Sequence, residues 1–192
     1  MSTLRNHASE LRHALEQLDD IDAPLRAAAE AVAGSFRAGG KLLAAGNGGS
    51  AAEAQHLTSE LIGRLHPDRE RGGLPAIALH ADTSTLTAVG NDYGYESVFA
   101  RYVAAIGRPG DVLVVLSTSG ASKNLVSAVA VATELEMVTI GLLGPGVRPL
   151  HDLCSHVLAV SSDSQQAIQE CHLVLVHVLV EHVEDLLSGT VS

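Results

Sequence analysis

The chain has 192 residues, of which 46% are hydrophobic, 3% aromatic and 18% charged. This length and composition are typical of one globular domain with a core of small aliphatic side chains. The formal net charge of −10 argues against general binding of nucleic acids or anionic membranes. It does not exclude a phosphorylated small molecule, because a local pocket can oppose the global charge.

Two cysteines, Cys154 and Cys171, are too few for a disulfide framework and are expected to be free thiols in a reducing compartment. The first residues contain no apolar signal segment. No run reaches the roughly 18 apolar residues that cross a membrane. We therefore expect a soluble cytoplasmic protein with neither a membrane nor a nucleic-acid partner.

Residues 1–38 place apolar side chains at helical spacing, with a break near Asp22 and Pro24. This pattern predicts two helices ahead of the first strand, which spans about 41–45. The next helix is predicted from Ser50, as its N-cap, to about residue 65. A charged loop rich in Gly and Pro follows at 66–75.

The rest of the chain alternates between predicted strands and predicted helices. Strands are expected at 76–80, 112–116, 138–142 and 157–160, and helices at 82–89, 96–106, 123–136 and 165–187, with turns at 90–94 and 144–146. Alternation with short loops predicts an α/β fold with a doubly wound parallel sheet. We expect a single domain over 1–192, made of an N-terminal helical segment (1–38) and an α/β core (39–192) that ends in a long helix.

A glycine-rich turn, Gly46-Asn47-Gly48-Gly49-Ser50, lies between the first strand and the helix that follows it. Glycines allow a ligand close to the backbone, and the start of a helix favours an anion. Further along that helix His56 and Glu60 stand four residues apart, so they share one helix face. Such a pair is common on surfaces, and its place beyond a ligand turn is what suggests acid/base or metal chemistry.

Residues 117–122 hold four hydroxyl side chains between a buried strand and a helix. Hydroxyls and helix-start N–H groups together form a neutral anion cradle, which favours phosphate binding over a merely solvated loop. Neither this loop nor the glycine turn matches the nucleotide P-loop or the dinucleotide fingerprint. Because loops after parallel strands share one sheet edge, the turn at 46, this loop and a second hydroxyl-rich loop at 161–164 can converge.

His177 lies in the middle of the final helix, which is apolar nearly all round. Periodicity alone favours a core histidine whose ring is satisfied by hydrogen bonds. A buried polar group needs a partner or a metal, however. Gln169 and Glu170 both project roughly toward His177 from two turns earlier, and the spacing slightly favours Glu170 without deciding between them.

Seven motifs follow one another along the chain: 46–56 (GNGGSAAEAQH), 59–64 (SELIGR), 74–79 (LPAIAL), 90–94 (GNDYG), 107–111 (GRPGD), 117–120 (STSG) and 168–172 (IQECH). Together they resemble the phosphoheptose isomerase family of sugar isomerase (SIS) domain enzymes. The resemblance covers about residues 5–187.

The resemblance implies a SIS-type, flavodoxin-like three-layer sandwich that converts sedoheptulose 7-phosphate to D-glycero-D-manno-heptose 7-phosphate. It also implies a homotetramer with active sites between subunits and one Zn²⁺ per subunit. The implied zinc ligands are His56, Glu60, Gln169 and His177, and Glu60 and His177 are the implied acid/base pair. Substrate-contacting positions implied by the match are Asn47, Gly48, Gly49, Ser50, Glu60, Arg64, Asn91, Asp92, Ser117, Thr118, Ser119, Ser122 and Gln169.

The implied chemistry agrees with the residues themselves. Ketose–aldose exchange through an enediol needs a proton moved between adjacent carbons, which a carboxylate and an imidazole can perform. A metal or hydrogen-bond donor stabilises the developing oxyanion. We assign Glu60 as the base at carbon and His177 as the acid at oxygen. The chain departs from the family pattern at Glu53, where Asp is common, at His80, which replaces a hydroxyl residue, and at 165–167, which often holds Asp and Arg.

Three alternatives belong to other functional classes or other substrates. A relative with the same domain is a non-catalytic tetrameric adaptor that binds the bacterial replication initiator, but it lacks the acid/base pair that Glu60 and His177 supply here. A sugar-phosphate-sensing regulator would usually carry a DNA-binding segment, and no such segment is visible in the sequence. Isomerisation of another ketose phosphate is the third alternative.

Overall fold

The computed structural model describes residues 2–189 and contains a five-stranded, fully parallel sheet in the order β2-β1-β3-β4-β5. The α/β sheet predicted from the sequence is therefore confirmed. Its strands are β1 (Leu42–Gly46), β2 (Ala76–Ala78), β3 (Val112–Ser117), β4 (Val138–Leu143) and β5 (His156–Ala159).

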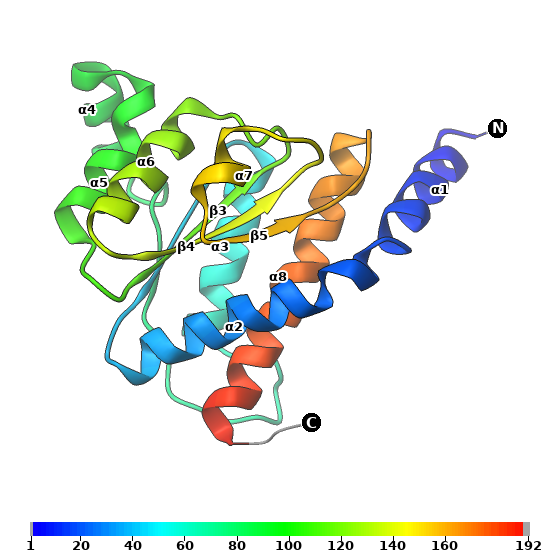
Figure 1. Cartoon of the computed structure of the whole chain (residues 1–192), viewed down its shortest axis with the longest axis horizontal. Coiled ribbons are helices and arrows are strands. Elements are labelled where there is room, and N and C mark those ends of the chain that lie inside the picture. Colours follow the sequence, from blue (N-terminus) through cyan, green and yellow to red (C-terminus); the bar gives the residue numbers. More distant parts are fainter. Residues whose placement is uncertain (1, 190–192) are drawn as a thin grey trace.

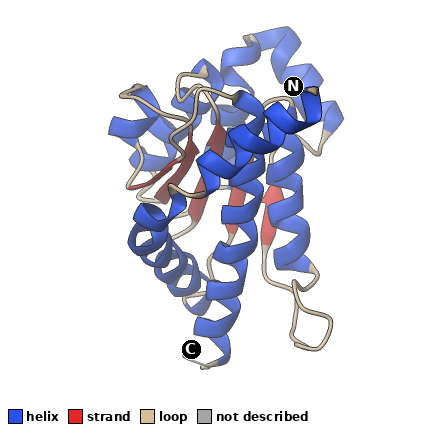
Figure 2. Ribbon diagram, turned by 90° about the vertical axis from the view of Figure 1, so that its right-hand side faces the viewer, coloured by secondary structure: helices blue, strands red, loops and turns tan. Residues whose placement is uncertain are grey.

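Helices cover both faces of the sheet and make a three-layer sandwich (Figures 1 and 2). One face packs against α1 (Thr3–Leu15), α2 (Asp22–Arg37), α3 (Gly49–Ile62) and α8 (Gln165–Ser188). The opposite face packs against α4 (Thr83–Tyr93), α5 (Val98–Ile106), α6 (Lys123–Glu134) and α7 (Pro149–Leu153). Two short 3₁₀ helices, η1 (Leu18–Ile21) and η2 (Tyr95–Ser97), connect neighbouring helices.

The central strands are apolar on both faces because a layer of helices covers each face of the sheet. In β1, Leu42 and Ala44 belong to the core beneath α8, whereas Leu43 and Ala45 belong to the core beneath α5 and α6. Alternate residues of a strand point to opposite faces, so a strand buried twice becomes a continuous apolar run. No helix within residues 2–189 combines the length and the apolar character needed to cross a membrane.

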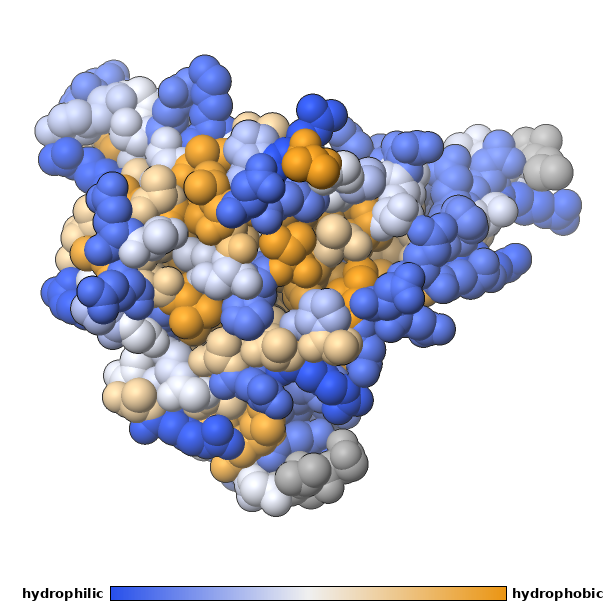
Figure 3. All heavy atoms as spheres, viewed as in Figure 1, coloured by the Kyte–Doolittle hydropathy of each residue, from blue (hydrophilic) through white to orange (hydrophobic). Residues whose placement is uncertain are grey.

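The two N-terminal helices predicted from the sequence are present, and only the second of them lies across the sheet. α2 packs along α8, whereas α1 projects from the body and presents mostly hydrophilic residues (Figures 1 and 3). His7 attaches α1 to α8 by a 2.8 Å contact with the carboxylate of Glu170. The two cysteines are free, as expected, with Cys171 buried and Cys154 half-buried.

Two local predictions are wrong. The turn predicted at 90–94 is helical through Tyr93, because α4 begins on an Asp82 cap and continues to Gly94, whose φ of +83° ends it. The chain after the turn at 144–146 also forms α7, which the sequence reading missed. α7 has only five residues, too few to show a helical period, and it begins at Pro149, a residue suited to the first helical turn.

Candidate active site

The glycine turn and the hydroxyl loop lie side by side because they follow neighbouring strands. β1 pairs with β2 on one side and with β3 on the other, so the winding of the sheet reverses between β1 and β3. In parallel sheets of this order, ligands bind in the crevice outside the carboxyl ends of the strands at that point. The predicted meeting of these two loops is confirmed.

The turn after β1 depends on two glycines. Gly48 has a φ of +57°, a conformation that favours glycine. A Cβ atom at Gly49 would lie 2.5 Å from Nε2 of Gln169, so a side chain at residue 49 would displace the end of the Gln169 side chain from the turn. The prediction that Ser50 caps α3 is wrong. The backbone turns at Gly48, which is the N-cap, and Ser50 is a buried residue in the first turn of the helix.

The hydroxyl groups of the loop after β3 gather around one buried atom, Oγ of Ser117. This oxygen accepts a hydrogen bond from the N–H of Gly120 at 3.1 Å and lies 3.4 Å from Oγ of both Ser119 and Ser122. α6 begins directly afterwards at Lys123, so its positively polarised N-terminus adjoins the same hydroxyls. The arrangement is a cradle of neutral donors suited to a phosphate group.

A small cavity of about 100 Å³ lies between the turn and the loop. This volume is below the ~300 Å³ or more of typical small-molecule pockets, so it suits one end of a sugar phosphate. The lining residues are Asn47, Ser50, Leu116, Ser117, Thr118, Ser119, Ser122 and Gln169.

Asn47 is held by two residues that the sequence reading did not select. Its side chain exchanges hydrogen bonds of 3.0 and 2.9 Å with the amide of Asn124, and its oxygen also accepts the Tyr95 hydroxyl proton at 3.0 Å. These bonds occupy the Asn47 oxygen and one of its two N–H groups, which leaves the second N–H available to a ligand. Asn124 is only 4% exposed, and the signal that could have revealed it is an amide in the first turn of the helix after the hydroxyl loop.

Asn124 acts on the proposed ligand only through Asn47, so replacing Asn124 should impair substrate binding indirectly. We expect Asn124→Ala to lower kcat/KM by about tenfold, because two hydrogen bonds that orient Asn47 are lost. Tyr95→Phe removes only one of the orienting bonds and should have an effect of about threefold or less. Steady-state kinetics on both variants would check the order, and an Asn124→Ala enzyme with unchanged kcat/KM would contradict the orienting role.

His56 and Glu60 of α3 meet His177 of α8. The Nε2 atoms of the two histidines are 2.9 Å apart, and Nε2 of His56 lies 3.4 Å from a carboxylate oxygen of Glu60. One ligand atom from each of the three residues lies within 4.8 Å of the others. All three are half-buried, so His177 is not the enclosed core histidine that periodicity favoured; that description fits His172, which is fully buried.

The chemistry of this donor set fits a catalytic zinc site. Two imidazole nitrogens and a carboxylate oxygen are ordinary Zn²⁺ ligands, and catalytic sites typically use three protein ligands and leave a position open. Two ligands bound at about 2.1 Å can be at most about 4.2 Å apart, and both distances from His56 satisfy this limit.

Gln169 and Glu170, the two candidates for the polar partner on α8, point in different directions. Glu170 bonds to His7 of α1 and therefore faces away from the His177 cluster. Gln169 lies against Gly49 and lines the hydroxyl cavity. The slight preference of the spacing for Glu170 is thus wrong, because α1 supplies a competing partner that helical spacing cannot reveal.

Six predicted substrate residues do not line the small cavity between the glycine turn and the hydroxyl loop. Gly48 and Gly49 belong to the turn itself, Glu60 lies in the cluster with His56 and His177, and the other three are Arg64, Asn91 and Asp92. Arg64 pairs with Glu70 in the exposed loop after α3. Asn91 and Asp92 are exposed on α4, and their side chains are bonded to each other at 2.7 Å. Their roles in substrate binding stay predictions.

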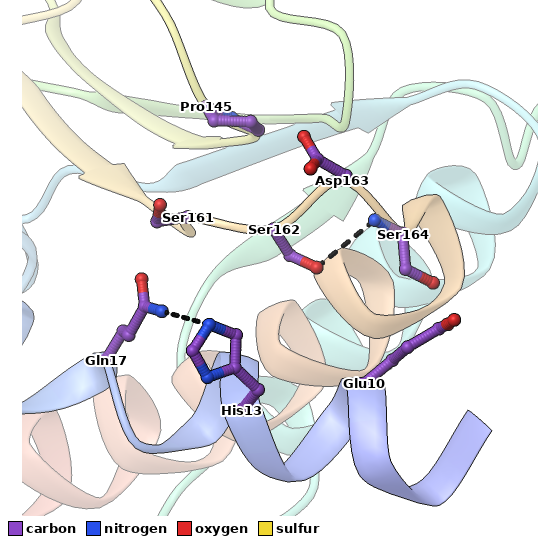
Figure 4. Close-up of a pocket in the computed structure, with 8 residues that line it drawn as sticks. All are labelled: Glu10, His13, Gln17, Pro145, Ser161, Ser162, Asp163 and Ser164. Carbon is purple, nitrogen blue, oxygen red and sulfur yellow. Dashed lines mark hydrogen bonds between the residues drawn. The ribbon is translucent and has the colours of Figure 1, made fainter. Parts of the chain in front are cut away.

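The second hydroxyl-rich loop does not converge with the other two. Ser161, Ser162 and Ser164 line a separate cavity of about 480 Å³ next to α1, where His13 and Gln17 are hydrogen-bonded at 3.0 Å (Figure 4). The expectation of three converging loops is therefore confirmed for the glycine turn and the loop at 117–122, and wrong for the loop at 161–164. This loop follows β5, at the edge of the sheet, and β4 separates it from the crevice between β1 and β3.

Glu53 and His172 lie side by side with little exposure to solvent, and their pKa values are shifted in opposite directions. Burial raises the pKa of the Glu53 carboxyl to about 7 and lowers the pKa of the His172 imidazole to about 4. Oε2 of Glu53 lies 3.8 Å from Nδ1 of His172. Each group is thus shifted toward its neutral form, because neither is well solvated.

Glu53→Gln should stabilise the metal-free protein in a pH-dependent way. The folded-state pKa of Glu53 lies above its ordinary value of 4.5, so the stability present below pH 4.5 is lost as the pH rises through 7. Glutamine has no such loss. We expect the variant to gain on the order of 2 kcal/mol in unfolding free energy at pH 8 and almost nothing near pH 4.5. Urea unfolding at both pH values measures this, and an equal gain at both would contradict the assignment to ionisation.

Comparisons with known proteins agree with this geometry. Residues 6–144 match the SIS domain family. The chain is 47% identical over 170 residues to the phosphoheptose isomerase of Geotalea daltonii, covering 88% of each chain. It is 50% identical over 166 residues to that of Roseiflexus sp., covering 86% of this chain and 83% of the relative.

A solved structure supports the same assignment. The phosphoheptose isomerase from Neisseria gonorrhoeae superposes with a TM-score of 0.88 at 38% identity, over 95% of this chain and 97% of the other. The fold and the hydroxyl-lined crevice thus define a SIS-domain protein. Within that class, the chain belongs to the phosphoheptose isomerase family.

Proposed function

We propose that the protein is a ketose–aldose isomerase that converts sedoheptulose 7-phosphate to D-glycero-D-manno-heptose 7-phosphate. The observation that carries the proposal is the meeting of Glu60 and His177, with His56, between α3 and α8, the two helices whose N-terminal turns also line the phosphate cradle through Ser50 and Gln169. Membership of the phosphoheptose isomerase family supports the same reaction.

The residues divide the chemistry between them. The hydroxyls of 117–122 hold the phosphate, and the free N–H of Asn47 binds a substrate oxygen. The Glu60 carboxylate removes a proton from C1 of the open-chain ketose and returns it to C2. His177 donates a proton to the carbonyl oxygen at C2 and then accepts the hydroxyl proton of the oxygen at C1 as the aldehyde forms, which restores both side chains. Each proton thus moves between adjacent substrate atoms through a positioned side chain.

His56, Glu60, Gln169 and His177 would hold one Zn²⁺ per subunit. Bound there, the ion would polarise the two substrate oxygens and stabilise the negative charge of the enediolate. Gln169 would link the metal ligands to the phosphate cradle, because it also lines the small cavity beside the hydroxyl loop.

The proposed assembly is a cytoplasmic homotetramer with active sites between subunits. Two features support it: the cavity in one chain accommodates only part of the substrate, and apolar side chains near the site, Ile62 of α3 and Val174 of α8, are 54% and 38% exposed. Residues of a second chain would enclose the remainder of the sugar. Light scattering on the purified protein measures the subunit number directly.

Turnover on a panel of ketose phosphates tests the proposed substrate. We expect aldoheptose phosphate from sedoheptulose 7-phosphate, and much slower conversion of pentulose and hexulose phosphates. Faster conversion of a shorter ketose phosphate would overturn the choice of substrate. The absence of any turnover, together with specific binding of a replication initiator, would replace the enzyme with the adaptor.

A further inference from the structure

The loop between α3 and β2 contains a largely buried arginine, Arg71, whose side chain folds back onto the end of α3. The side chain of Arg71 is 16% exposed, although the loop around it is charged and solvated. Its guanidinium donates hydrogen bonds to the main-chain oxygens of Glu60 at 2.7 Å and Leu61 at 2.8 Å. These oxygens belong to the last turn of α3, where helix carbonyls lack partners within the helix.

Arg71 therefore acts as a side-chain cap for the carboxyl end of α3. A cation at this end also complements the negative end of the helix dipole. One of the two carbonyls belongs to Glu60 itself, so the cap holds the main chain of the proposed base.

The other side of the guanidinium contacts α8. Nε of Arg71 donates to a carboxylate oxygen of Glu184 at 2.8 Å, and the same oxygen accepts the N–H of Leu65 at 3.2 Å. The Glu184 side chain is 4% exposed, so the two charges depend on each other: removing either leaves a buried charge without its partner.

Glu184 stands seven residues after His177 on the same helix. Seven residues are two helical turns, so both side chains point to the same face of α8, toward α3. Arg71 thus joins the end of the helix that carries His56 and Glu60 to the helix that carries His177. No disulfide links these helices, since both cysteines are free thiols.

We propose that Arg71 and Glu184 form a positioning clamp that sets α3 relative to α8 and thereby fixes the mutual geometry of His56, Glu60 and His177. The clamp makes no contact with the reacting atoms. Its importance rests on the proposed function of those three residues.

The same loop offers a matched control. Arg69 also pairs with α8, through Asp185 at 2.6 Å, but it is 45% exposed and its side chain makes no hydrogen bond to α3 within the described residues. Arg69→Gln therefore removes an arginine–carboxylate pair, two residues away, without releasing the end of α3.

Cobalt in place of zinc gives a readout that does not depend on activity. Full-length parent, Arg71→Gln, Arg71→Lys, Glu184→Gln and Arg69→Gln proteins are titrated with Co²⁺, whose visible spectrum reports ligand geometry. kcat and KM for sedoheptulose 7-phosphate are measured in parallel, and thermal unfolding confirms that each variant is folded.

We expect Arg71→Gln and Glu184→Gln to weaken Co²⁺ binding by about 10-fold to 100-fold, the range seen when groups that orient metal ligands are removed. The Co²⁺ spectrum should change, and kcat should fall while KM stays within about twofold, because the glycine turn and the hydroxyl loop are untouched. Arg71→Lys keeps the charge without the planar fork and should recover part of the loss. Arg69→Gln should match the parent.

Parent-like Co²⁺ binding and kcat in Arg71→Gln would overturn the clamp, as would an equal loss in Arg69→Gln. If Arg71→Gln does not fold, Arg71→Lys and Glu184→Gln decide by the same criteria. A parent protein that binds no Co²⁺ would refute the proposed metal centre alone, and the kcat comparison would still decide the role of the clamp.

Discussion

Glu60→Gln is expected to reduce kcat by about 10³-fold, within the range that general acid–base catalysis contributes. The amide keeps the size and shape of the side chain but cannot accept a proton from C1 of the ketose. KM should change much less, because the phosphate cradle at 117–122 remains intact. A coupled assay for the aldoheptose phosphate measures both constants.

The same variant also weakens one proposed metal ligand, so its zinc content must be measured beside its rate. Loss of turnover at full zinc occupancy would assign the defect to the proton transfer itself. A Glu60→Gln enzyme with parental activity would contradict the catalytic assignment, and an unchanged assembly by light scattering would exclude a folding defect.

His177→Ala is expected to lose about as much activity as Glu60→Gln, and also most of its affinity for zinc. The substitution removes the proposed acid at the carbonyl oxygen together with a nitrogen that lies 2.9 Å from Nε2 of His56. Because His177 is only half-buried, the folded protein should survive. Kinetics and bound zinc per subunit are the two measurements.

His66→Ala is the matched control for this prediction. His66 also faces α8, where its ring lies 3.4 Å from Glu181, one helical turn beyond His177 and outside the cluster. It should retain parental kcat and zinc content. Comparable losses in both variants would mean that any histidine between α3 and α8 matters only for packing.

Most of the architecture could be predicted from the sequence, because strands buried on both faces leave strong signals. Residues 112–116 of β3 form a continuous apolar run between a Gly-containing turn and a polar loop, and such runs belong to parallel sheets covered by helices. The errors fell where local composition and tertiary contacts disagree. The 90–94 segment has turn residues, yet η2 and α5 pack against α4 and extend that helix to Tyr93.

The candidate site divides in the same way. Residues adjacent in sequence, such as His56 with Glu60 or the hydroxyls of 117–122, could be selected from spacing alone. Contacts across long sequence separations could not. Asn124 binds Asn47 from 77 residues away, and Arg71 reaches Glu184 from 113 residues away. Neither pair has a periodic signal, so only the folded chain reveals them.

Isomerisation of sedoheptulose 7-phosphate in D₂O tests the central claim most directly. With zinc present, proton and carbon NMR should show an aldoheptose 7-phosphate at equilibrium, with deuterium incorporated at C2 because Glu60 exchanges its proton with solvent during repeated turnover. Removal of zinc should slow the reaction strongly. A ketose that stays unchanged, or an aldose that carries only protium at C2 after prolonged incubation, would contradict the enediol proton transfer by Glu60 and His177.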